Sequence, residues 1–213
     1  MPTPQPRQPI THLLDLHGFR SSPQSTKART MAHHMATHHP EVHWWCPQLP
    51  PSPREAMTMV MQGIADWPRE STALVGSSLG GFYATWVAEQ TGCRAVLLNP
   101  AVYPARDLEK YIGEQTSWHD PQAHFFFLPE FVEELRAIAP ASLTQLDRFF
   151  AVIAKGDEVL DWQEMTGRYL GARIKLLEGG DHALSDFDDH VDEVLAFMGL
   201  AHTGIERVAT SVA

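Results

Sequence analysis

The pentapeptide Gly76-Ser77-Ser78-Leu79-Gly80 carries the residue of this chain best suited to covalent chemistry. An apolar, β-prone run (72–75) leads into it and a helix-prone stretch (82–90) follows it. In such a strand–turn–helix setting, the middle serine of Gly-x-Ser-x-Gly stands on a sharp turn with its hydroxyl exposed. A Cβ two residues to either side would collide with the crossing backbone. The spacing therefore predicts that Ser78 is a nucleophile and that Gly76 and Gly80 form its turn, while Ser77 lacks flanking glycines at that spacing.

A serine hydroxyl needs a base to take its proton, and the base is usually a histidine oriented by a carboxylate. Asp157 and His182 follow Ser78 in the order Ser, Asp, His. Asp157 comes directly after the turn residue Gly156, just beyond the strand predicted at 149–154. His182 comes after Gly179-Gly180, which gives its loop the freedom to reach the serine. We expect Asp157 to be the acid and His182 the general base.

Other carboxylates near these positions compete for the acid role. Glu158 and Asp161 are the rivals of Asp157, and Asp161 also suits the N-cap of the helix predicted after it. Asp181 is adjacent to His182, and an adjacent side chain cannot easily fold back onto Nδ1 of its neighbour. We expect Asp181 to be a loop or helix-start residue.

A developing oxyanion needs two preorganised hydrogen-bond donors. The backbone N–H of Leu79, the residue after the nucleophile, is the first candidate. The second is the backbone N–H of Phe19, in the loop His17-Gly18-Phe19 that follows the first predicted strand. We expect Gly18 to keep that backbone open and His17 to shape the loop.

Alternating strands and helices must position these residues. Apolar runs predict strands at 10–16, 42–46, 72–75, 94–98, 149–154 and 173–177. Helical patterns fall at 26–38, 53–67, 82–90, 162–170 and 187–198. This alternation predicts an α/β fold: a doubly wound, mostly parallel sheet of about six strands with helices on both faces. Such sheets bind ligands beyond the carboxyl ends of their strands, where the candidate residues lie.

The predicted domain, 10–200, contains one long interruption at 103–148, which we expect to be a small helical cap insertion. Its aromatic run 125–128 and Phe131 could line an acyl pocket or pack the cap onto the core, and the sequence favours neither. A proline-rich leader (1–9) is expected to be disordered and the tail (201–213) flexible.

The composition of the chain argues against some classes of binding partner. The chain has 213 residues with 44% hydrophobic and 20% charged residues, which is ordinary for a globular domain. A net charge of −10 argues against nucleic acid or an anionic membrane as the main partner. No apolar run is long enough to cross a bilayer and the leader lacks a secretory signal, so we expect a cytoplasmic protein without integral membrane contact. Oligomeric state does not follow from these residues.

Cofactor and metal sites are not indicated. The segment 76–81 lacks the Lys-Ser/Thr ending of a phosphate-binding loop. Histidines 33, 34, 38 and 39 lie near helical spacing, but no cysteine or carboxylate completes a set of metal ligands at regular spacing, so a solvated helix face is expected. Cys46 and Cys93 are expected to be free thiols.

Several motifs together resemble the YqiA/YcfP-type small bacterial esterases of the α/β-hydrolase superfamily. The likeness runs from about Ile10 to Leu200 and is weakest over the cap insertion. The motifs that carry it are His17–Pro23, Pro47–Pro50, Val75–Trp86, Asn99–Val102, Gly156–Asp161 and Glu178–Ala183. The resemblance implies a compact α/β-hydrolase fold without the first two antiparallel strands. It also implies a Ser-Asp-His triad, matched by Ser78, Asp157 and His182, and hydrolysis of carboxylic esters or thioesters.

The residues and the resemblance together predict a serine esterase or thioesterase that works through an acyl-enzyme. The substrate would be a small acyl ester or thioester. Two alternatives stay open: an acyltransferase, lipase or peptidase that uses the same triad, and a non-catalytic binding protein on the same fold.

Overall fold

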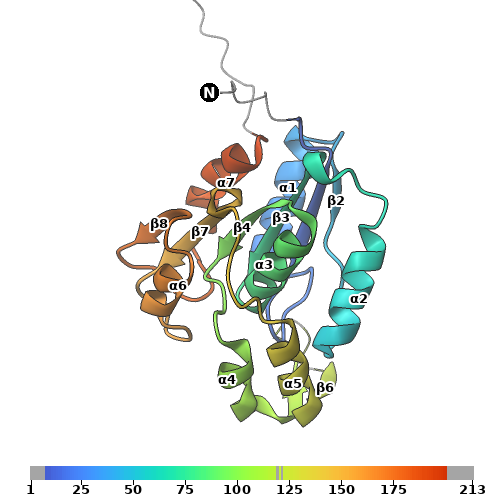
Figure 1. Cartoon of the computed structure of the whole chain (residues 1–213), viewed down its shortest axis with the longest axis vertical. Coiled ribbons are helices and arrows are strands. Elements are labelled where there is room, and N and C mark those ends of the chain that lie inside the picture. Colours follow the sequence, from blue (N-terminus) through green and yellow to red (C-terminus); the bar gives the residue numbers. More distant parts are fainter. Residues whose placement is uncertain (1–7, 119, 121, 201–213) are drawn as a thin grey trace, which may run out of the picture.

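The computed structural model describes residues 8–118, 120 and 122–200. The predicted tail (201–213) and residues 1–7 of the predicted leader lie outside the described residues. Both ends of the described chain lie at the same end of the molecule, opposite the cap insertion (Figure 1).

A parallel sheet of six strands forms the centre of the fold, in the order β2-β1-β3-β4-β7-β8. All five strand pairings are parallel. The strands are β1 (His12–Leu16), β2 (His43–Trp45), β3 (Thr72–Ser77), β4 (Arg94–Leu98), β7 (Phe149–Ala154) and β8 (Arg173–Leu177). Every residue of β7 is buried, as expected for a strand covered on both faces. The predicted doubly wound α/β fold is confirmed.

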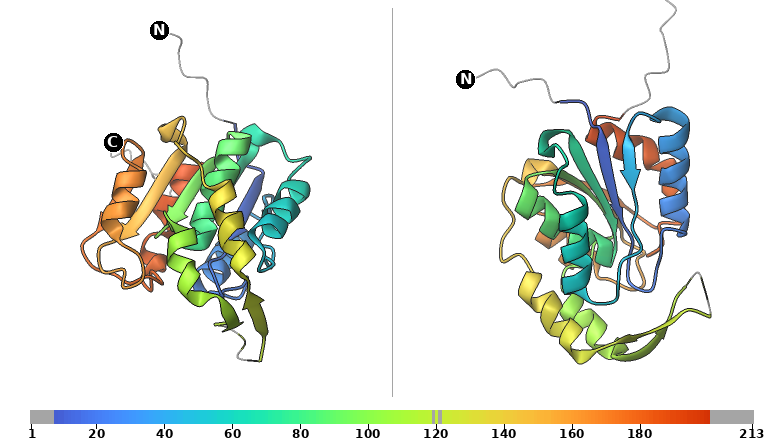
Figure 2. Two further views of the ribbon diagram at one scale, coloured as in Figure 1. Left: turned by 60° about the horizontal axis from the view of Figure 1, so that its bottom comes forward. Right: turned by 90° about the vertical axis from the view of Figure 1, so that its right-hand side faces the viewer.

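Helices cover both faces of the sheet (Figures 1 and 2). One face packs against α1 (Thr26–His38) and α7 (Val191–Met198). The other packs against α2 (Pro53–Gly63), α3 (Leu79–Thr91) and α6 (Trp162–Arg168). Alternate strand residues therefore enter different cores: Leu13 faces α1 and α7, whereas Leu14 faces α2 and α3.

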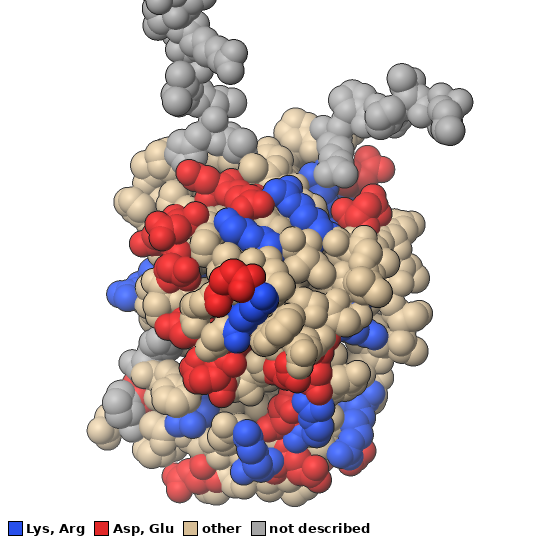
Figure 3. Space-filling view, turned by 90° about the vertical axis from the view of Figure 1, so that its left-hand side faces the viewer, with Lys and Arg blue, Asp and Glu red and all other residues tan. Residues whose placement is uncertain are grey.

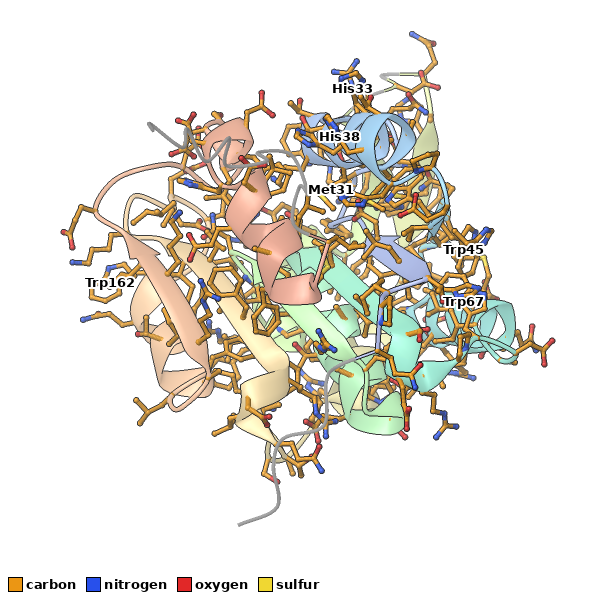
Figure 4. All side chains as sticks on the ribbon, turned by 90° about the horizontal axis from the view of Figure 1, so that it is seen from above. Met31, His33, His38, Trp45, Trp67 and Trp162 are labelled. Carbon is orange, nitrogen blue, oxygen red and sulfur yellow. The ribbon has the colours of Figure 1, made fainter. Side chains whose placement is uncertain are left out.

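Helix α2 ends at Gly63, earlier than the predicted end at residue 67. A side chain at Gly63 would lie 2.2 Å from the Trp45 ring, so the chain passes this point as glycine, a poor helix former. Trp67 lies beyond the helix, and its ring centroid is 6.0 Å from that of Trp45. Figure 4 labels the two neighbouring side chains. The apolar pattern of the sequence extends to Trp67 because the rings of Trp45 and Trp67 pack against the core, although the helix has already ended.

The cap insertion contains a hairpin that the sequence did not predict. It includes the short helix α4 (Pro104–Leu108) and helix α5 (Pro129–Ile138), and between them strands β5 (Gly113–Thr116) and β6 (His124–Phe127) pair antiparallel. The insertion is thus helical only in part. Its strands have four residues each, too few to give a clear alternating pattern. The hairpin projects from the carboxyl edge of the sheet (Figure 2). Short 3₁₀ turns lie at Arg69–Ser71, Glu109–Tyr111, Leu146–Arg148 and Phe187–Asp189.

Acidic and basic side chains alternate on the face shown in Figure 3, rather than gathering into one basic patch. Three ion pairs join charged residues near strands β7 and β8: Lys155–Glu178, Arg173–Glu193 and Lys175–Glu193. Within the described residues, no helix has the length and hydrophobicity needed to cross a membrane.

A buried carboxylate ties the cap to the sheet domain. Glu134 of α5 is only 9% exposed. It accepts hydrogen bonds from the Ser52 hydroxyl (2.7 Å), the Arg54 backbone N–H (3.1 Å) and the Arg54 guanidinium (2.6 Å). Ser52 is also the N-cap of α2 and accepts from the Glu55 N–H at 3.2 Å. The Glu134 carboxylate therefore holds α5 against the sheet domain and also binds the N-terminal residues of α2.

We predict that Glu134→Gln lowers the free energy of unfolding by about 1–3 kcal/mol. The side-chain NH₂ of glutamine is a donor, and the groups around it, the Ser52 hydroxyl and the N–H groups of Arg54, are donors as well. Glu133→Gln is the matched control: Glu133 is 69% exposed and pairs with Arg136 at the surface, so a change below about 0.5 kcal/mol is expected. Urea unfolding measures both variants. Equal losses in the two would contradict the role given to Glu134.

Candidate active site

Ser78 occupies the turn between β3 and α3 with φ 55° and ψ −120°. The backbones cross so closely that a Cβ on Gly80 would lie 1.8 Å from the Leu16 carbonyl oxygen, and one on Gly76 would lie 2.2 Å from the Gly80 oxygen. Positive φ is strained for a residue with a side chain. Two hydrogen bonds to β4 and its loop hold the turn: the Ser78 N–H donates to the Leu98 carbonyl at 2.9 Å, and the Ser78 carbonyl accepts from the Ala101 N–H at 3.0 Å.

Asp157, His182 and Ser78 form a continuous hydrogen-bonded chain. His182 Nδ1 lies 2.8 Å from Asp157 Oδ2, and His182 Nε2 lies 3.0 Å from Ser78 Oγ. The Asp157 side chain is fully buried, and its other oxygen accepts from the backbone N–H groups of Val159 and Leu160, both at 2.8 Å. The carboxylate therefore favours a proton on Nδ1, which leaves Nε2 to accept from the serine hydroxyl.

The rival carboxylates are engaged elsewhere. Asp161 is the N-cap of α6 and accepts from the Gln163 N–H at 2.8 Å. Asp181 accepts from the N–H and hydroxyl of Ser185, and these bonds lower the pKa of Asp181. Glu158 accepts from the backbone N–H of His182 at 3.0 Å, so it touches the histidine loop but not the imidazole.

The loop after β1 runs directly over the nucleophile. A Cβ on Gly18 would lie 3.2 Å from the Ser78 Cβ. The Gly18 carbonyl accepts from the Ser21 N–H at 3.2 Å and lies 3.0 Å from His17 Nδ1. In a trans peptide the carbonyl and the following N–H point in opposite directions, so these bonds fix the direction of the Phe19 N–H.

The buried His17 ring joins two loops of the site. Its Nε2 accepts from the Leu49 N–H at 3.0 Å, which places the proton on Nδ1, where it donates to Gly18. His17 thus shapes the loop as the sequence indicates. Among the described residues, neither the Phe19 nor the Leu79 N–H donates to a backbone or side-chain acceptor. Leu79 begins α3, where the first N–H groups have no acceptor within the helix.

Aromatic rings of the cap hold the Phe19 side chain. Its ring lies 5.2 Å from Phe127, 5.6 Å from Tyr111 and 5.9 Å from Phe125. Phe127 is buried in the core, whereas Phe126 is 62% exposed, as alternation along β6 requires. Phe125 lines a cavity of about 630 Å³ whose walls include Leu79 but not Ser78. The aromatic run therefore packs the cap and also borders a hollow beside the site.

Asn99 joins the loops that carry the acid and the base, a role the sequence did not reveal. It is fully buried with φ 41°. Its Oδ1 accepts from the Ala154 N–H at 2.8 Å, and its Nδ2 donates to the carbonyls of Asp181 (3.0 Å) and His182 (3.3 Å). The signal available in the sequence was a polar residue between an apolar strand and a proline, which usually marks a turn.

Ser78 and His182 lie between two cavities. A cavity of about 370 Å³ extends toward α1, past Lys27 and Asp15. A smaller one of about 150 Å³ lies under the cap and is bordered by Leu108, Tyr111 and Leu160. The Ser78 hydroxyl is thus accessible from two sides.

The histidine cluster of α1 lies away from this site. Figure 4 shows His33 on the outer side of the helix and Met31 on the side facing the sheet. His33 and His38 are exposed. Across residues 8–118, 120 and 122–200, no group of three or more His, Cys, Asp or Glu side chains is arranged to hold a metal ion. Cys46 and Cys93 are free.

Comparison with known families gives a match over most of the chain. Residues 12–199 match the uncharacterised protein family UPF0227. A UPF0227 protein of Yersinia pestis is 25% identical over 132 residues, which cover 62% of this chain and 67% of the relative.

Solved structures with a similar fold include enzymes that act on esters. Est1E from Butyrivibrio proteoclasticus, solved with ferulic acid bound, has a TM-score of 0.66 at 13% identity and covers 92% of this chain and 90% of its own. A metagenome-derived lipolytic enzyme of the LipS and LipT pair has a TM-score of 0.66 at 18% identity, with 90% and 95% covered. The esterase domain of a Rhodothermus marinus protein has a TM-score of 0.61 at 21% identity, with 90% and 87% covered. At these identities the likeness shows the fold.

We predict that Asn99→Ala lowers the free energy of unfolding by about 2–4 kcal/mol, since it leaves several buried backbone groups without partners. It should also shift the downfield proton resonance of His182 Nδ1–H, because the histidine loop loses its anchor. Urea unfolding and proton NMR measure the two effects. Gln163→Ala, which removes an exposed amide, is the control; an unshifted imidazole signal in Asn99→Ala would contradict the positioning role.

Proposed function

The chain belongs to the UPF0227 family, as its YqiA/YcfP-type motifs predict, and we propose that it is a serine hydrolase cleaving carboxylic esters or thioesters through an acyl-enzyme. The observation that carries this proposal is the hydrogen-bonded chain from Asp157 through His182 to Ser78, with bonds of 2.8 and 3.0 Å. The strained Ser78 turn, typical of an activated nucleophile, supports it.

In the first half of the reaction, Ser78 Oγ attacks the carbonyl carbon while its proton moves to His182 Nε2. Asp157 stabilises the imidazolium without taking the proton, and its two backbone hydrogen bonds hold it in place. The N–H groups of Leu79 and Phe19 donate to the oxyanion. The tetrahedral intermediate then collapses: the bond to the alcohol or thiol breaks, and His182 returns its proton to that leaving group.

Water completes the cycle. His182 removes a proton from a water molecule, which attacks the acyl-Ser78 carbonyl, and the same two N–H groups hold the second oxyanion. Collapse of this intermediate releases the carboxylic acid and restores the serine proton. Every step uses side chains and backbone groups of this chain, so the proposed reaction needs no cofactor.

The nucleophile assignment is tested with a fluorophosphonate probe and intact-mass analysis. We expect one adduct on the wild type and on Ser77→Ala, and none on Ser78→Ala, because phosphonylation needs an activated hydroxyl. Ser77→Ala is the matched control, one residue away on the same strand end. An unlabelled wild type, or an equally labelled Ser78→Ala, would show that the protein is a binding module or works by another route.

The acid assignment is tested by Asp157→Asn. We expect kcat for p-nitrophenyl butyrate to fall by about 10³–10⁴, since the amide favours the wrong imidazole tautomer. Asp181→Asn is the control, because Asp181 bonds Ser185 and not the imidazole, and its kcat should stay within about threefold of the wild type. Similar losses in both variants would refute the assignment of Asp157.

A further inference from the structure

Asp15 is a buried carboxylate that the proposed reaction does not use. It lies in β1, beside Val75 of β3, on the sheet face that packs against α1 and α7. Leu13, Val75, Val96 and Leu98 share this face and are apolar. Asp15 is only 7% exposed. A carboxylate in such surroundings destabilises the fold unless a partner compensates it.

The charge of Lys27 acts on Asp15, but it does so without a direct contact. Within the part of the chain that the structure describes, no group donates a hydrogen bond to the Asp15 carboxyl, and no cation lies within ion-pair distance of it. The side chain instead lines the cavity of about 370 Å³ that also contains Ser78 and His182. The unsatisfied acceptor thus faces the space that a substrate of the proposed reaction would enter.

Lys27, from the first turn of α1, places a donor in the same cavity. Its Nζ donates to the carbonyl of Ala183, next to His182, which fixes the ammonium at the wall of the site. Burial lowers the pKa of Lys27, while the charge of Asp15 raises it. An ammonium has three donors, so Lys27 retains donors for a ligand. The hydroxyls of Ser25 and Thr26 border the cavity at this end.

The two charges together select a neutral ligand. A carboxylate or phosphate would pair with Lys27 but be repelled by Asp15. An ammonium would pair with Asp15 but be repelled by Lys27. A purely alkyl group would leave the Asp15 carboxyl unsatisfied. A hydroxyl group satisfies both residues, because its proton is donated to Asp15 while its oxygen accepts from Lys27.

We propose that Asp15 and Lys27 form a subsite for a neutral, hydroxylated arm of the substrate, so that this protein favours esters bearing a free hydroxyl over their alkyl analogues. The inference rests on the proposed hydrolase function and adds the chemistry of one arm of the substrate. The other cavity, under the cap, also has charged residues in its lining, but Asp107 there is paired with Arg106 at 2.8 Å and Arg20 donates to the Thr116 carbonyl at 2.7 Å.

The titration of Asp15 supports the design of the variants. Burial raises the pKa of Asp15 from 3.8 to about 7, against the opposing effect of Lys27. Between pH 3.8 and about 7, the unfolded chain loses the Asp15 proton before the folded chain does, so the free energy of unfolding falls as pH rises. Above pH 7 this loss of stability is complete and no longer changes with pH. Asp15→Asn lacks this cost and is expected to fold at least as stably as the wild type at pH 8.

Two matched substrate pairs test the subsite in the full chain. The first compares p-nitrophenyl β-hydroxybutyrate with p-nitrophenyl butyrate, and the second compares glyceryl butyrate with propyl butyrate. We expect kcat/KM to favour the hydroxylated member of one pair by at least about tenfold, because a site built to bind a hydroxyl rejects the analogue without it. The pair that responds identifies whether the acyl or the alcohol arm lies beside Asp15.

Variants assign the preference to these residues. In Asp15→Leu, the ratio of kcat/KM for the hydroxylated ester to that for its alkyl analogue should fall to within about twofold of one. The same ratio should fall in Lys27→Met. It should be kept in part in Asp15→Asn, because the amide oxygen still accepts a hydrogen bond. Lys175→Met is the control: Lys175 lies on β8 and pairs with Glu193 of α7, and the ratio of this variant should equal that of the wild type. If Asp15→Leu does not fold by urea unfolding, the Lys27→Met ratio decides.

The outcomes separate this inference from the proposed function. Ser78 labelled by fluorophosphonate, with ratios near one for both pairs, would overturn the subsite and leave the hydrolase standing. An unchanged wild-type preference in Asp15→Leu or in Lys27→Met would also overturn it. Unlabelled wild type and no turnover of any of the four esters would overturn the proposed function itself.

Discussion

The close packing of three backbone segments at the Ser78 turn is the constraint on which the site depends. Gly80 lies against the carbonyls at the end of β1, and Gly76 lies against Gly80, so no larger residue fits at either point. This contact brings the end of β1 next to the end of β3, which sets the Gly18–Phe19 loop over the serine. The strain at Ser78 costs about 1–3 kcal/mol, and its hydrogen bonds to Leu98 and Ala101 help to offset that cost.

The base and acid depend on a second constraint, the buried amide of Asn99. Asp157 and His182 lie on loops after β7 and β8, which are neighbours in the sheet, and β4 lies beside β7. Asn99 follows β4 and bonds the backbone of Ala154, at the end of β7, and of the loop that carries His182, so one side chain sets the spacing between them. The hydrogen-bonded chain of Asp157, His182 and Ser78 thus depends on the ends of four of the six strands: β3, β4, β7 and β8. A change at any one of these strand ends would alter the position of the imidazole.

Sequence alone predicted the sheet and its layers from the apolar runs of its strands. It also proposed Ser78, Asp157 and His182, which the structure brings together in one hydrogen-bonded chain. It missed the β5–β6 hairpin, whose strands are short and partly exposed, so no period stands out. It also missed the bridging role of Asn99, the only asparagine of the chain, because a hydrogen bond between distant segments leaves no local pattern. The lack of a hydrogen-bond donor for Asp15 among the described residues became visible only with the fold.

Phe19 connects the cap to the chemistry. Its backbone N–H is a proposed oxyanion donor, its ring packs among Tyr111, Phe125 and Phe127 of the cap, and its side chain borders the cavities on both sides of Ser78. The backbone and the ring belong to one residue, so a shift of the cap rings displaces the amide as well. Because Glu134 anchors α5 to the start of α2, the position of the cap is set by the sheet domain rather than by the hairpin alone. The geometry of the donor therefore depends on how the cap docks, which makes the cap part of the site's framework and not only a cover over it.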